Sequence, residues 1–231
     1  MNHVIVMTMY KRLGYTRTVL DALSRCEGVD KYRIFLHCEP GCRAVEDLAR
    51  TFPLPGKEVV INPRKLGCTR NTFAALDHGF GASDYVIALE DDVVPAPDAL
   101  RFFEHCRDAY RDDLSVFTAC AYRRHPAGPE DLYKLTRTQW FTPWGWATWI
   151  DRWKPGRGLW QPDSPTSWDV IFNQQLRGDR YEVSPLLART QNIGAVDGTY
   201  CTDSKWHREN QFNEHWAGAV ALPGGQFVEV R

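Results

Sequence analysis

The sequence has no long apolar segment, no excess of charge of either sign and no paired-cysteine motif. The apolar run in "MNHVIVMTMY" lasts only a few residues before Lys11 and Arg12. That is too short for a signal peptide or a membrane span, and it is typical of a first strand. We therefore expect a cytoplasmic protein, from a bacterium or a virus-infected host cell, whose first strand begins near residue 1.

Several classes of protein are excluded by what is missing. A formal net charge of -1 over 231 residues argues against a global polycation that binds nucleic acid or an anionic membrane. The seven cysteines contain no CxxC pair, and the spacing of Cys38 and Cys42 fits no common zinc site. We expect reduced, mostly buried thiols. The glycine patterns GxGxxG and GxxxxGK are absent, which excludes the dinucleotide and P-loop classes.

The first half of the chain instead alternates two apolar patterns. Strand-like runs occupy residues 3–9, 32–38, 57–62, 84–90 and 114–122, and helical spacing occupies 15–26, 42–51, 68–80 and 97–110. This order predicts parallel βαβ units in an α/β fold. Beyond Tyr122 the pattern breaks, and short helical pieces are expected around Ala147 and at 170–176. We predict one domain over 1–231, with a nucleotide-sugar half (1–122) and an acceptor half (123–231).

Three carboxylates follow the apolar strand at 84–90. Glu90, Asp91 and Asp92 stand where ligands bind in open α/β sheets, beyond the carboxyl end of a strand. Adjacent carboxylates raise one another's pKa unless a cation neutralises them. Hard oxygen ligands favour Mg²⁺ or Mn²⁺, which commonly also hold substrate phosphates. The simpler interpretation is a solvated acidic turn.

The segment "ALEDDVVPAPDALRFFEHC" resembles the metal-binding segment of inverting glycosyltransferases of the GT-A fold. It is most similar to the N-acetylglucosaminyltransferase I family, and matching motifs run from Val4 to about His215. The resemblance implies a Rossmann-like, mixed and mostly parallel central sheet flanked by helices. It also implies that Asp92 binds Mn²⁺ (or Mg²⁺), while Glu90 and Asp91 contact the donor sugar and ribose.

Other motifs of the first half follow in the order of that family. "TMYKRLGYTRTVLDAL" implies that Arg12 reaches the nucleotide, and "IFLHCEPG" implies that Glu39 accepts a hydrogen bond from uracil N3–H. "NPRKLGCTRNTFAAL" implies that Asn71 and Arg70 hold the nucleotide, with Gly67 at the start of the third helix. The structural alternatives are that Arg12 is a surface charge and that Gly67 merely ends a loop.

The second half offers a candidate catalytic base. In "SPTSWDVIFNQQL", Ser167 is expected to cap a helix, with Asp169 in its first turn, where a carboxylate also stabilises the helix dipole. The segment resembles the family's Trp-Asp motif, which implies that Asp169 is the general base and that Trp168 lines the donor sugar. "WFTPWGWATW" is similar to an acceptor-side segment, with Trp144 and Trp146 nearest the site and the other tryptophans packed.

Cations near the C-terminus complete the expected site. Arg189 in "LLARTQNIG" is expected to assist the departing diphosphate, together with Lys205, His207 and Arg208 of "DSKWHREN". Residues 194–213 resemble the mobile loop that closes over the donor. His207 is a candidate metal ligand, as in other GT-A families, although the N-acetylglucosaminyltransferase I pattern lacks such a histidine.

Together these motifs predict transfer of a GlcNAc-like sugar from a UDP-sugar to an acceptor hydroxyl, with inversion. The acceptor is left open between a glycan, a small molecule and hydroxymethylated bases of phage DNA, for which "YRRHP" and "YKLTRTQW" would supply phosphate contacts. A binding protein without transfer activity is the main alternative. A sugar nucleotidylyltransferase would carry a glycine-rich signature after the first strand, and a phosphodiester hydrolase would show further His and Asp ligands.

Overall fold

The computed structural model describes residues 3–124, 127–160, 167–196, 204–210 and 225–230. In the first half, the strands are β1 (His3–Met9), β2 (Tyr32–Cys38), β3 (Lys57–Ile61), β4 (Tyr85–Glu90), β5 (Val93–Pro95) and β6 (Val116–Cys120). The helices between them are α1 (Leu13–Ser24), α2 (Arg43–Thr51), α3 (Cys68–Ala82) and α4 (Ala99–Ala109), with a 3-10 turn at Val29–Lys31. The predicted alternation is confirmed, and β5 is the addition to it.

The second half is more regular than its sequence suggests. Its strands are β7 (Lys134–Thr138), β8 (Trp146–Trp149), β9 (Tyr181–Pro185), β10 (Thr190–Asn192) and β11 (Val228–Glu229). Its helical segments are a 3-10 turn (Pro129–Asp131), α5 (Ile150–Arg157), α6 (Trp168–Ile171), a π-helical turn (Phe172–Leu176) and α7 (Ser204–Asn210). The helix expected at 170–176 is therefore confirmed, and the residues of both halves share one sheet.

That sheet has the strand order β11-β7-β9-β6-β8-β4-β1-β2-β3, and β10 pairs separately with β5. Strand β8 lies between β4 and β6 and is antiparallel to both, with Ala147 opposite Ile87 on one side and Ala119 on the other. The helix predicted around Ala147 is therefore wrong. All four residues of "WATW" are buried, so the strand shows no polar alternation by which it could be recognised.

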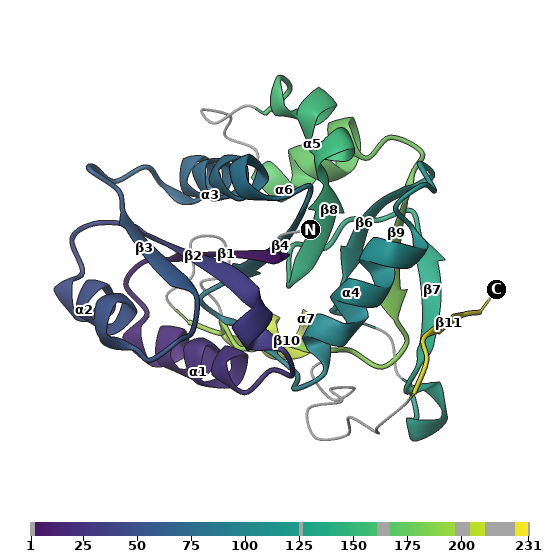
Figure 1. Cartoon of the computed structure of the whole chain (residues 1–231), viewed down its shortest axis with the longest axis horizontal. Helices are drawn as coiled ribbons and strands as arrows, with labels where there is room; N and C mark the ends of the chain where they lie inside the picture. The colour runs from purple at the N-terminus through teal and green to yellow at the C-terminus, as the bar shows by residue number, and fades with distance from the viewer. Residues whose placement is uncertain (1–2, 125–126, 161–166, 197–203, 211–224, 231) are drawn as a thin grey trace.

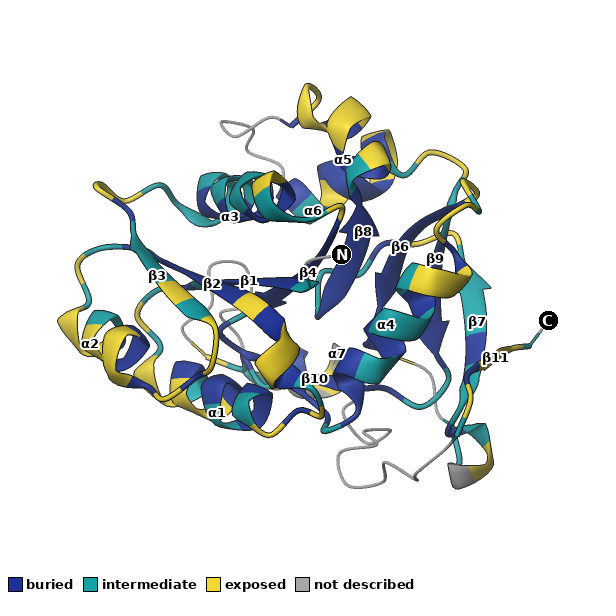
Figure 2. Ribbon diagram, in the orientation of Figure 1, coloured by how far each residue is buried: buried dark blue, intermediate teal, exposed yellow. Residues whose placement is uncertain are grey.

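Helices cover both faces of the large sheet. Figure 1 shows α3, α5 and α6 on one face and α1, α2 and α4 on the other. Because side chains alternate along a strand, Val4 and Val6 of β1 pack in the apolar cluster beneath α3, while Ile5 and Met7 pack beneath α1. In Figure 2 the central strands of the sheet are buried, while strands at its edges and the outward helix faces are more exposed. This arrangement leaves the strand ends as the place where polar side chains can gather.

Membrane-spanning helices and disulfides were two features that the sequence did not predict. Within the described part of the chain, no helix is both long enough and apolar enough to span a bilayer. The six described cysteines are free thiols, and those that are buried are Cys26, Cys38, Cys106 and Cys120. Cys201 lies outside the described residues.

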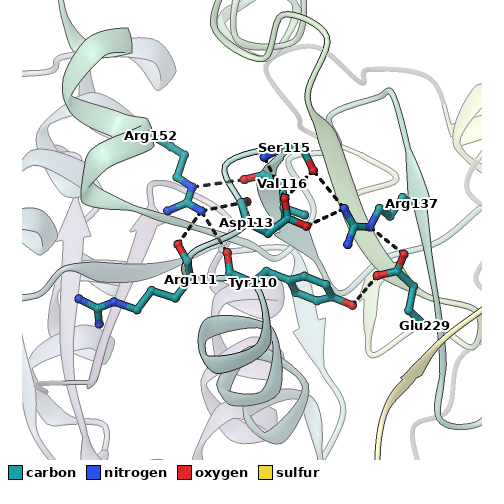
Figure 3. A network of polar contacts seen from close by, with 8 residues as sticks. All are labelled: Tyr110, Arg111, Asp113, Ser115, Val116, Arg137, Arg152 and Glu229. Atoms are coloured by element: carbon teal, nitrogen blue, oxygen red, sulfur yellow. Dashed lines mark hydrogen bonds and ion pairs between the residues drawn. The ribbon is translucent and has the colours of Figure 1, made fainter.

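A buried arginine joins α5 to the loop between α4 and β6 (Figure 3). Arg152 is 3% exposed, and its charge is balanced by Asp151, whose Oδ1 lies 2.8 Å from Nη1. Its remaining donors reach four backbone carbonyls, those of Tyr110, Arg111, Asp113 and Val116. A guanidinium satisfied in this way helps to hold the loop, whereas removing it strands several buried acceptors.

We predict that Arg152→Met lowers the free energy of unfolding by about 3 kcal/mol, since buried carbonyls lose their donors. Arg157→Met, on the same helix, is the matched control, because Arg157 is half exposed and pairs with Asp77 at the surface. It should cost at most about 1 kcal/mol. Urea denaturation of both variants measures the difference. Equal losses would show that the network in Figure 3 does not stabilise the fold.

A buried carboxyl in β9 gives the stability a specific pH dependence. Glu182 is 2% exposed, and its Oε2 accepts hydrogen bonds from Thr118 Oγ1 at 3.2 Å and from the Thr142 amide at 2.9 Å. Burial raises the pKa of Glu182 from 4.5 to about 8, although these hydrogen bonds oppose the shift. Folded protein therefore holds a proton that unfolded protein releases.

We expect the free energy of unfolding to fall as the pH rises from about 4.5 to about 8, because the folded state binds the extra proton across this interval. Glu182→Gln removes this contribution, so the melting temperature of the variant, relative to wild type, should rise by several degrees between pH 5 and pH 8. Glu130→Gln, at an exposed position, should follow the wild-type profile. Parallel profiles for all three proteins would contradict the assignment.

Candidate functional site

Three predicted site segments meet at the carboxyl edge of the sheet. Strands β2, β1 and β4 are adjacent and parallel, with Thr8 opposite Glu90 and Met9 opposite Cys38. The chain leaves β1 toward Arg12, leaves β2 at Glu39 and leaves β4 at the carboxylate cluster. The structure therefore brings these segments together, although 80 residues of sequence separate Arg12 from Asp92.

Arg12 bridges two of the three clustered carboxylates. Its Nη1 lies 2.7 Å from Asp92 Oδ2, and its Nη2 donates to Asp91 Oδ1. The side chains of Asp91 and Asp92 are 5% and 8% exposed, and that of Arg12 is 16% exposed. Burial opposes the charge of Arg12, but Asp92 and Asp91 outweigh it and raise the pKa of the guanidinium. The crowded acids thus have a cation from the chain itself, so crowding alone is no evidence for a metal.

The oxygen atoms of this cluster are unequally satisfied. Asp91 Oδ2 accepts the Tyr10 amide at 3.3 Å, whereas Asp92 Oδ1 is buried and has no hydrogen-bond partner among the described residues. Burial and Asp91 raise the pKa of Asp92 to about 6, while Arg12 opposes the shift. Burial, Asp92 and Asp91 together raise the pKa of Glu90. One buried acceptor is therefore available in a strongly negative surrounding.

This donor set fits a divalent ion that brings its other ligands with it. Within the described residues, no group of three or more His, Cys, Asp or Glu side chains could enclose a metal. A single carboxylate oxygen, such as Asp92 Oδ1, combined with water and substrate phosphates is a common environment for Mg²⁺ and related hard ions. The residues fit an ion held jointly with a diphosphate and do not fit a closed protein cage.

The β2 end carries a second unsatisfied acceptor. Glu39 is 4% exposed; its Oε2 accepts the Leu66 amide at 2.8 Å, and its Oε1 is buried without a partner. Asn71 is used within the protein, because its Oδ1 accepts from Asn62 Nδ2 at 2.8 Å and its Nδ2 donates to the His37 carbonyl. Glu39 can therefore accept a hydrogen bond from a ligand, whereas the Asn71 side chain is engaged within the protein, beside Glu39.

The remaining predicted residues of the first half lie at the start of α3, next to Asn71. Arg70 lies in the first turn of α3 and is partly exposed. Gly67 precedes this helix with a φ of 81°, a conformation that glycine adopts without strain. Tyr10 and Lys65, which were not predicted, also lie here, with Lys65 Nζ 4.8 Å from the centre of the Tyr10 ring. Both residues belong to motifs quoted in the sequence analysis, and each follows a predicted strand. This position beside a strand end was the sequence signal that could have identified them.

Asp169 lies near Glu90 on the other side of the cluster. Ser167 occupies the predicted N-cap of α6, but its hydroxyl donates to Asp169 Oδ1 and makes no capping bond. Asp169 is partly exposed and adds its charge to those that raise the pKa of Glu90. Cys68 was missed: burial, followed by Glu90, raises the pKa of this thiol to about 12. Its position at the start of α3 was the only sequence signal.

The tryptophans separate into packed and exposed groups. Trp168 is 3% exposed, and its ring stacks on Trp160 at 5.4 Å, while Trp146 packs 6.1 Å from Trp168. With Glu90, Trp146 and Trp168 line a small cavity beneath the strand ends. Trp144 is partly buried against Tyr122. Trp140 was expected to be packed, and this is wrong, because it is 61% exposed.

The structure does not bring Arg189 to the carboxylate cluster. Arg189 is fully buried; its Nε lies 2.9 Å from Asp98 Oδ2, and its other nitrogens donate to the carbonyls of Leu187 and Leu132. Its predicted role at the diphosphate disagrees with these contacts, because every nitrogen is already used inside the protein. The sequence motif could not reveal a partner 91 residues away.

His207 approaches the cluster indirectly. Its Nε2 lies 3.2 Å from Asn192 Oδ1, which also accepts the Gly194 amide, and the Ile193 amide donates to the Asp92 carbonyl. The structure thus places His207 beside the segment that covers Asp92, and ligation of a metal remains a prediction. Lys205 is exposed and pairs with Glu209. The Arg208 side chain, and residues 197–203 and 211–213 of the predicted mobile loop, lie outside the described residues.

No protein-family model and no curated protein sequence matches the chain. Among solved structures, it is similar to the mannosyltransferase PcManGT from Pyrobaculum calidifontis in complex with GDP-Man and Mn2+, with 15% identity and a TM-score of 0.55 over 81% of this chain and 57% of that one. TarS of S. aureus (1-349) gives 9% identity and a TM-score of 0.60 over 82% and 59%. Its complex with UDP-GlcNAc gives 11% and 0.56 over 80% and 58%.

These similarities confirm the predicted fold. The chain is a mixed α/β domain with a GT-A-type central sheet flanked by helices. It spans less than two thirds of the length of each of these neighbours. The specific resemblance to the N-acetylglucosaminyltransferase I family remains a hypothesis.

Gly194 tests how tightly the segment over Asp92 is packed. A Cβ at this position would lie 1.9 Å from Asp92 Oδ2 and 3.2 Å from Arg12 Nη1. We predict that Gly194→Ala displaces the Asp92 carboxylate and so weakens Mn²⁺-dependent binding of UDP. The UDP concentration that gives half of the maximal thermal stabilisation in the presence of Mn²⁺ should rise at least about 10-fold. Gly14→Ala, which has open space around its Cβ, should leave this midpoint unchanged. Identical midpoints for both variants would show that the contact has no bearing on binding.

Proposed function

We propose that the chain is a metal-dependent inverting glycosyltransferase that transfers a sugar, GlcNAc-like by its resemblance, from a UDP-sugar to a hydroxyl group. The observation that carries this proposal is the pair of buried acceptors without a partner among the described residues, Asp92 Oδ1 and Glu39 Oε1, at the ends of β4 and β2, the two strands that flank β1 in a GT-A fold. Unpaired buried oxygens are costly, so a ligand that supplies a cation and an N–H donor would compensate both.

Glu39 would bind the base of the donor. Its free Oε1 can accept one hydrogen bond from an imide N–H such as uracil N3–H, while the Leu66 amide holds the other oxygen in place. Arg70 and Asn71, on α3, would line the nucleotide site beside Glu39. Asn71 would support this site by its hydrogen bonds to Asn62 and to the His37 carbonyl. The partly exposed Arg70 would be the member of this set that reaches the nucleotide itself.

Asp92 would hold the divalent ion together with the donor diphosphate. When bound, Mn²⁺ or Mg²⁺ neutralises charge on the departing nucleoside diphosphate. Glu90, whose pKa is raised by burial and by its acidic neighbours, can keep a proton and donate it in a hydrogen bond to a sugar hydroxyl. Asp91 would remain held by Arg12 and the Tyr10 amide, beside the ribose.

Asp169 would accept the proton of the attacking hydroxyl. Ser167 donates to Oδ1 and fixes the orientation of the carboxylate, so Oδ2 is the oxygen that would take the proton. Attack from the face opposite the diphosphate forms the new glycosidic bond as the old one breaks, which inverts the anomeric centre. Trp168 is largely buried under this region and would support the sugar through a limited part of its ring.

One observation favours an acceptor that carries negative charge. Arg123 follows β6, which is parallel to β4 and ends at the same sheet edge. Its Nε and Nη1 are buried and have no hydrogen-bond partner in the described part of the chain, and burial lowers the pKa of Arg123 against the influence of Asp131. A phosphate or carboxylate on the acceptor would satisfy these donors. This supports phosphate-bearing acceptors, hydroxymethylated DNA among them, over neutral glycans.

The test is a transfer assay with Mn²⁺ that measures nucleotide release and product formation. Donors would be UDP-GlcNAc, UDP-glucose and GDP-mannose; acceptors would be a neutral oligosaccharide, a polyol phosphate and a duplex with hydroxymethylated bases. Asp169→Asn should lower kcat at least about 100-fold with little change in UDP binding. Asp92→Asn should abolish Mn²⁺-dependent UDP binding. Asp179→Asn, at an exposed turn, should behave as wild type.

The variants also separate the proposal from its alternative. UDP-sugar binding without product on any acceptor, and unaffected by Asp169→Asn, would favour the binding protein. Full transfer activity in Asp169→Asn would remove this residue from the mechanism. Preference for the neutral oligosaccharide would contradict the role suggested for Arg123.

A further inference from the structure

We infer that Arg12 is a built-in counter-ion that competes with the divalent ion for Asp92, so that the ion binds only together with the nucleotide diphosphate. This inference rests on the proposed function of the site, and it assigns Arg12 a positioning role that differs from a simple nucleotide contact. It predicts that the divalent ion and the nucleotide bind together, a coupling that a single carboxylate would not produce.

The contacts leave little room for a metal beside Arg12. Arg12 engages one oxygen of Asp91 and one of Asp92, and the Tyr10 amide engages the second oxygen of Asp91. Asp92 Oδ1 is the one oxygen of these two side chains that has no partner. Without further ligands, a divalent ion at Oδ1 would have a single protein oxygen and a guanidinium close by. A divalent ion and a guanidinium that contact the same carboxylate repel each other strongly in a partly buried setting.

The backbone of Arg12 is anchored independently of the ion pairs that its guanidinium makes. The Arg12 carbonyl accepts the Thr16 amide and the Thr16 hydroxyl, each at 2.9 Å, which anchors the residue at the start of α1. No regular capping bond involves its side chain. The guanidinium is 16% exposed and lies beneath Gly194, where a Cβ would be 3.2 Å from Nη1. The side chain can therefore change partners without unfolding the helix.

A nucleoside diphosphate would resolve the competition from both sides. Its phosphate oxygens supply the missing ligands of the divalent ion, and two of them can also accept hydrogen bonds from the planar guanidinium of Arg12 in place of a carboxylate. Once Arg12 turns toward the phosphates, Asp92 Oδ2 becomes available to the ion. The nucleotide alone provides both effects, so metal and nucleotide should bind with strong positive coupling.

We predict that wild-type protein binds Mn²⁺ weakly in the absence of UDP and at least about 10-fold more tightly in its presence, because coupling of this size is typical between linked sites. Arg12→Met should bind Mn²⁺ without UDP at least about 10-fold more tightly than wild type, and UDP should increase its Mn²⁺ affinity by a smaller factor than in wild type, because only the ligands from the phosphates remain to be gained. Arg12→Lys should lie between them, since lysine keeps the charge but lacks the planar fork with which arginine contacts the two carboxylates. Arg17→Met, an exposed position on α1, is the matched control.

Electron paramagnetic resonance of free Mn²⁺ measures these affinities without any turnover. Arg12→Met leaves two buried carboxylates without their cation and is expected to be less stable, so thermal unfolding with and without Mn²⁺ provides a second measurement. Mn²⁺ alone should raise the melting temperature of Arg12→Met by several degrees and leave wild type unchanged. If Arg12→Met does not fold, Arg12→Lys carries the same comparison.

The outcomes separate this inference from the proposed function. UDP-dependent Mn²⁺ binding in wild type, with no tighter UDP-free binding in Arg12→Met or Arg12→Lys, overturns the competition and leaves the transferase proposal standing. Absence of Mn²⁺ binding in every protein, with and without UDP, overturns the metal role of Asp92 and this inference with it. Tight Mn²⁺ binding by wild type without UDP also overturns the inference.

Discussion

The ion triad of Arg12 with Asp91 and Asp92 is the interaction on which the site depends. It joins the start of α1 to the end of β4, and it makes burial of two adjacent carboxylates tolerable. The Ile193 amide then binds the Asp92 carbonyl, and β10 pairs with β5 directly after the cluster. Segments from both halves of the chain thus converge on one charged centre, which fixes the geometry around the unpartnered oxygen of Asp92.

The antiparallel insertion of β8 explains how one sheet edge can serve two substrates. Because β8 stands between β4 and β6, their carboxyl ends lie on the same edge but are separated by the width of a strand. The β4 side carries the carboxylates, and the β6 side leads to Arg123 with its unpartnered nitrogens. Trp146 of β8 faces Trp168 between the two sides. A donor bound at the end of β4 and an acceptor bound at the end of β6 would then lie on the same edge, on either side of β8.

Sequence pattern was sufficient wherever an element repeats a rule. The alternation in residues 3–122 predicted β1 to β4, β6 and four helices, because buried parallel strands and amphipathic helices have distinct periods. It failed at Ala147, since the four buried residues of β8 show neither period, and it did not reveal β5 or β10, which have three residues each. The carboxylate cluster was predicted from its place at a strand end, whereas Arg12 and Glu39 were implied by the resemblance of their motifs to those of a known family.

What the sequence could not supply is the partner of each charge. Arg12 and Arg189 both pair with an aspartate distant in the chain, but their surroundings give them opposite capacities. Arg189 has no exposure, and its nitrogens are distributed over Asp98 and two carbonyls, so exchange would strand several buried groups at once. Arg12 retains some exposure and stands next to an oxygen that lacks any partner. Burial and unfilled hydrogen-bonding capacity, and not the residue type, therefore distinguish the arginine that holds the fold from the one that can respond to a ligand.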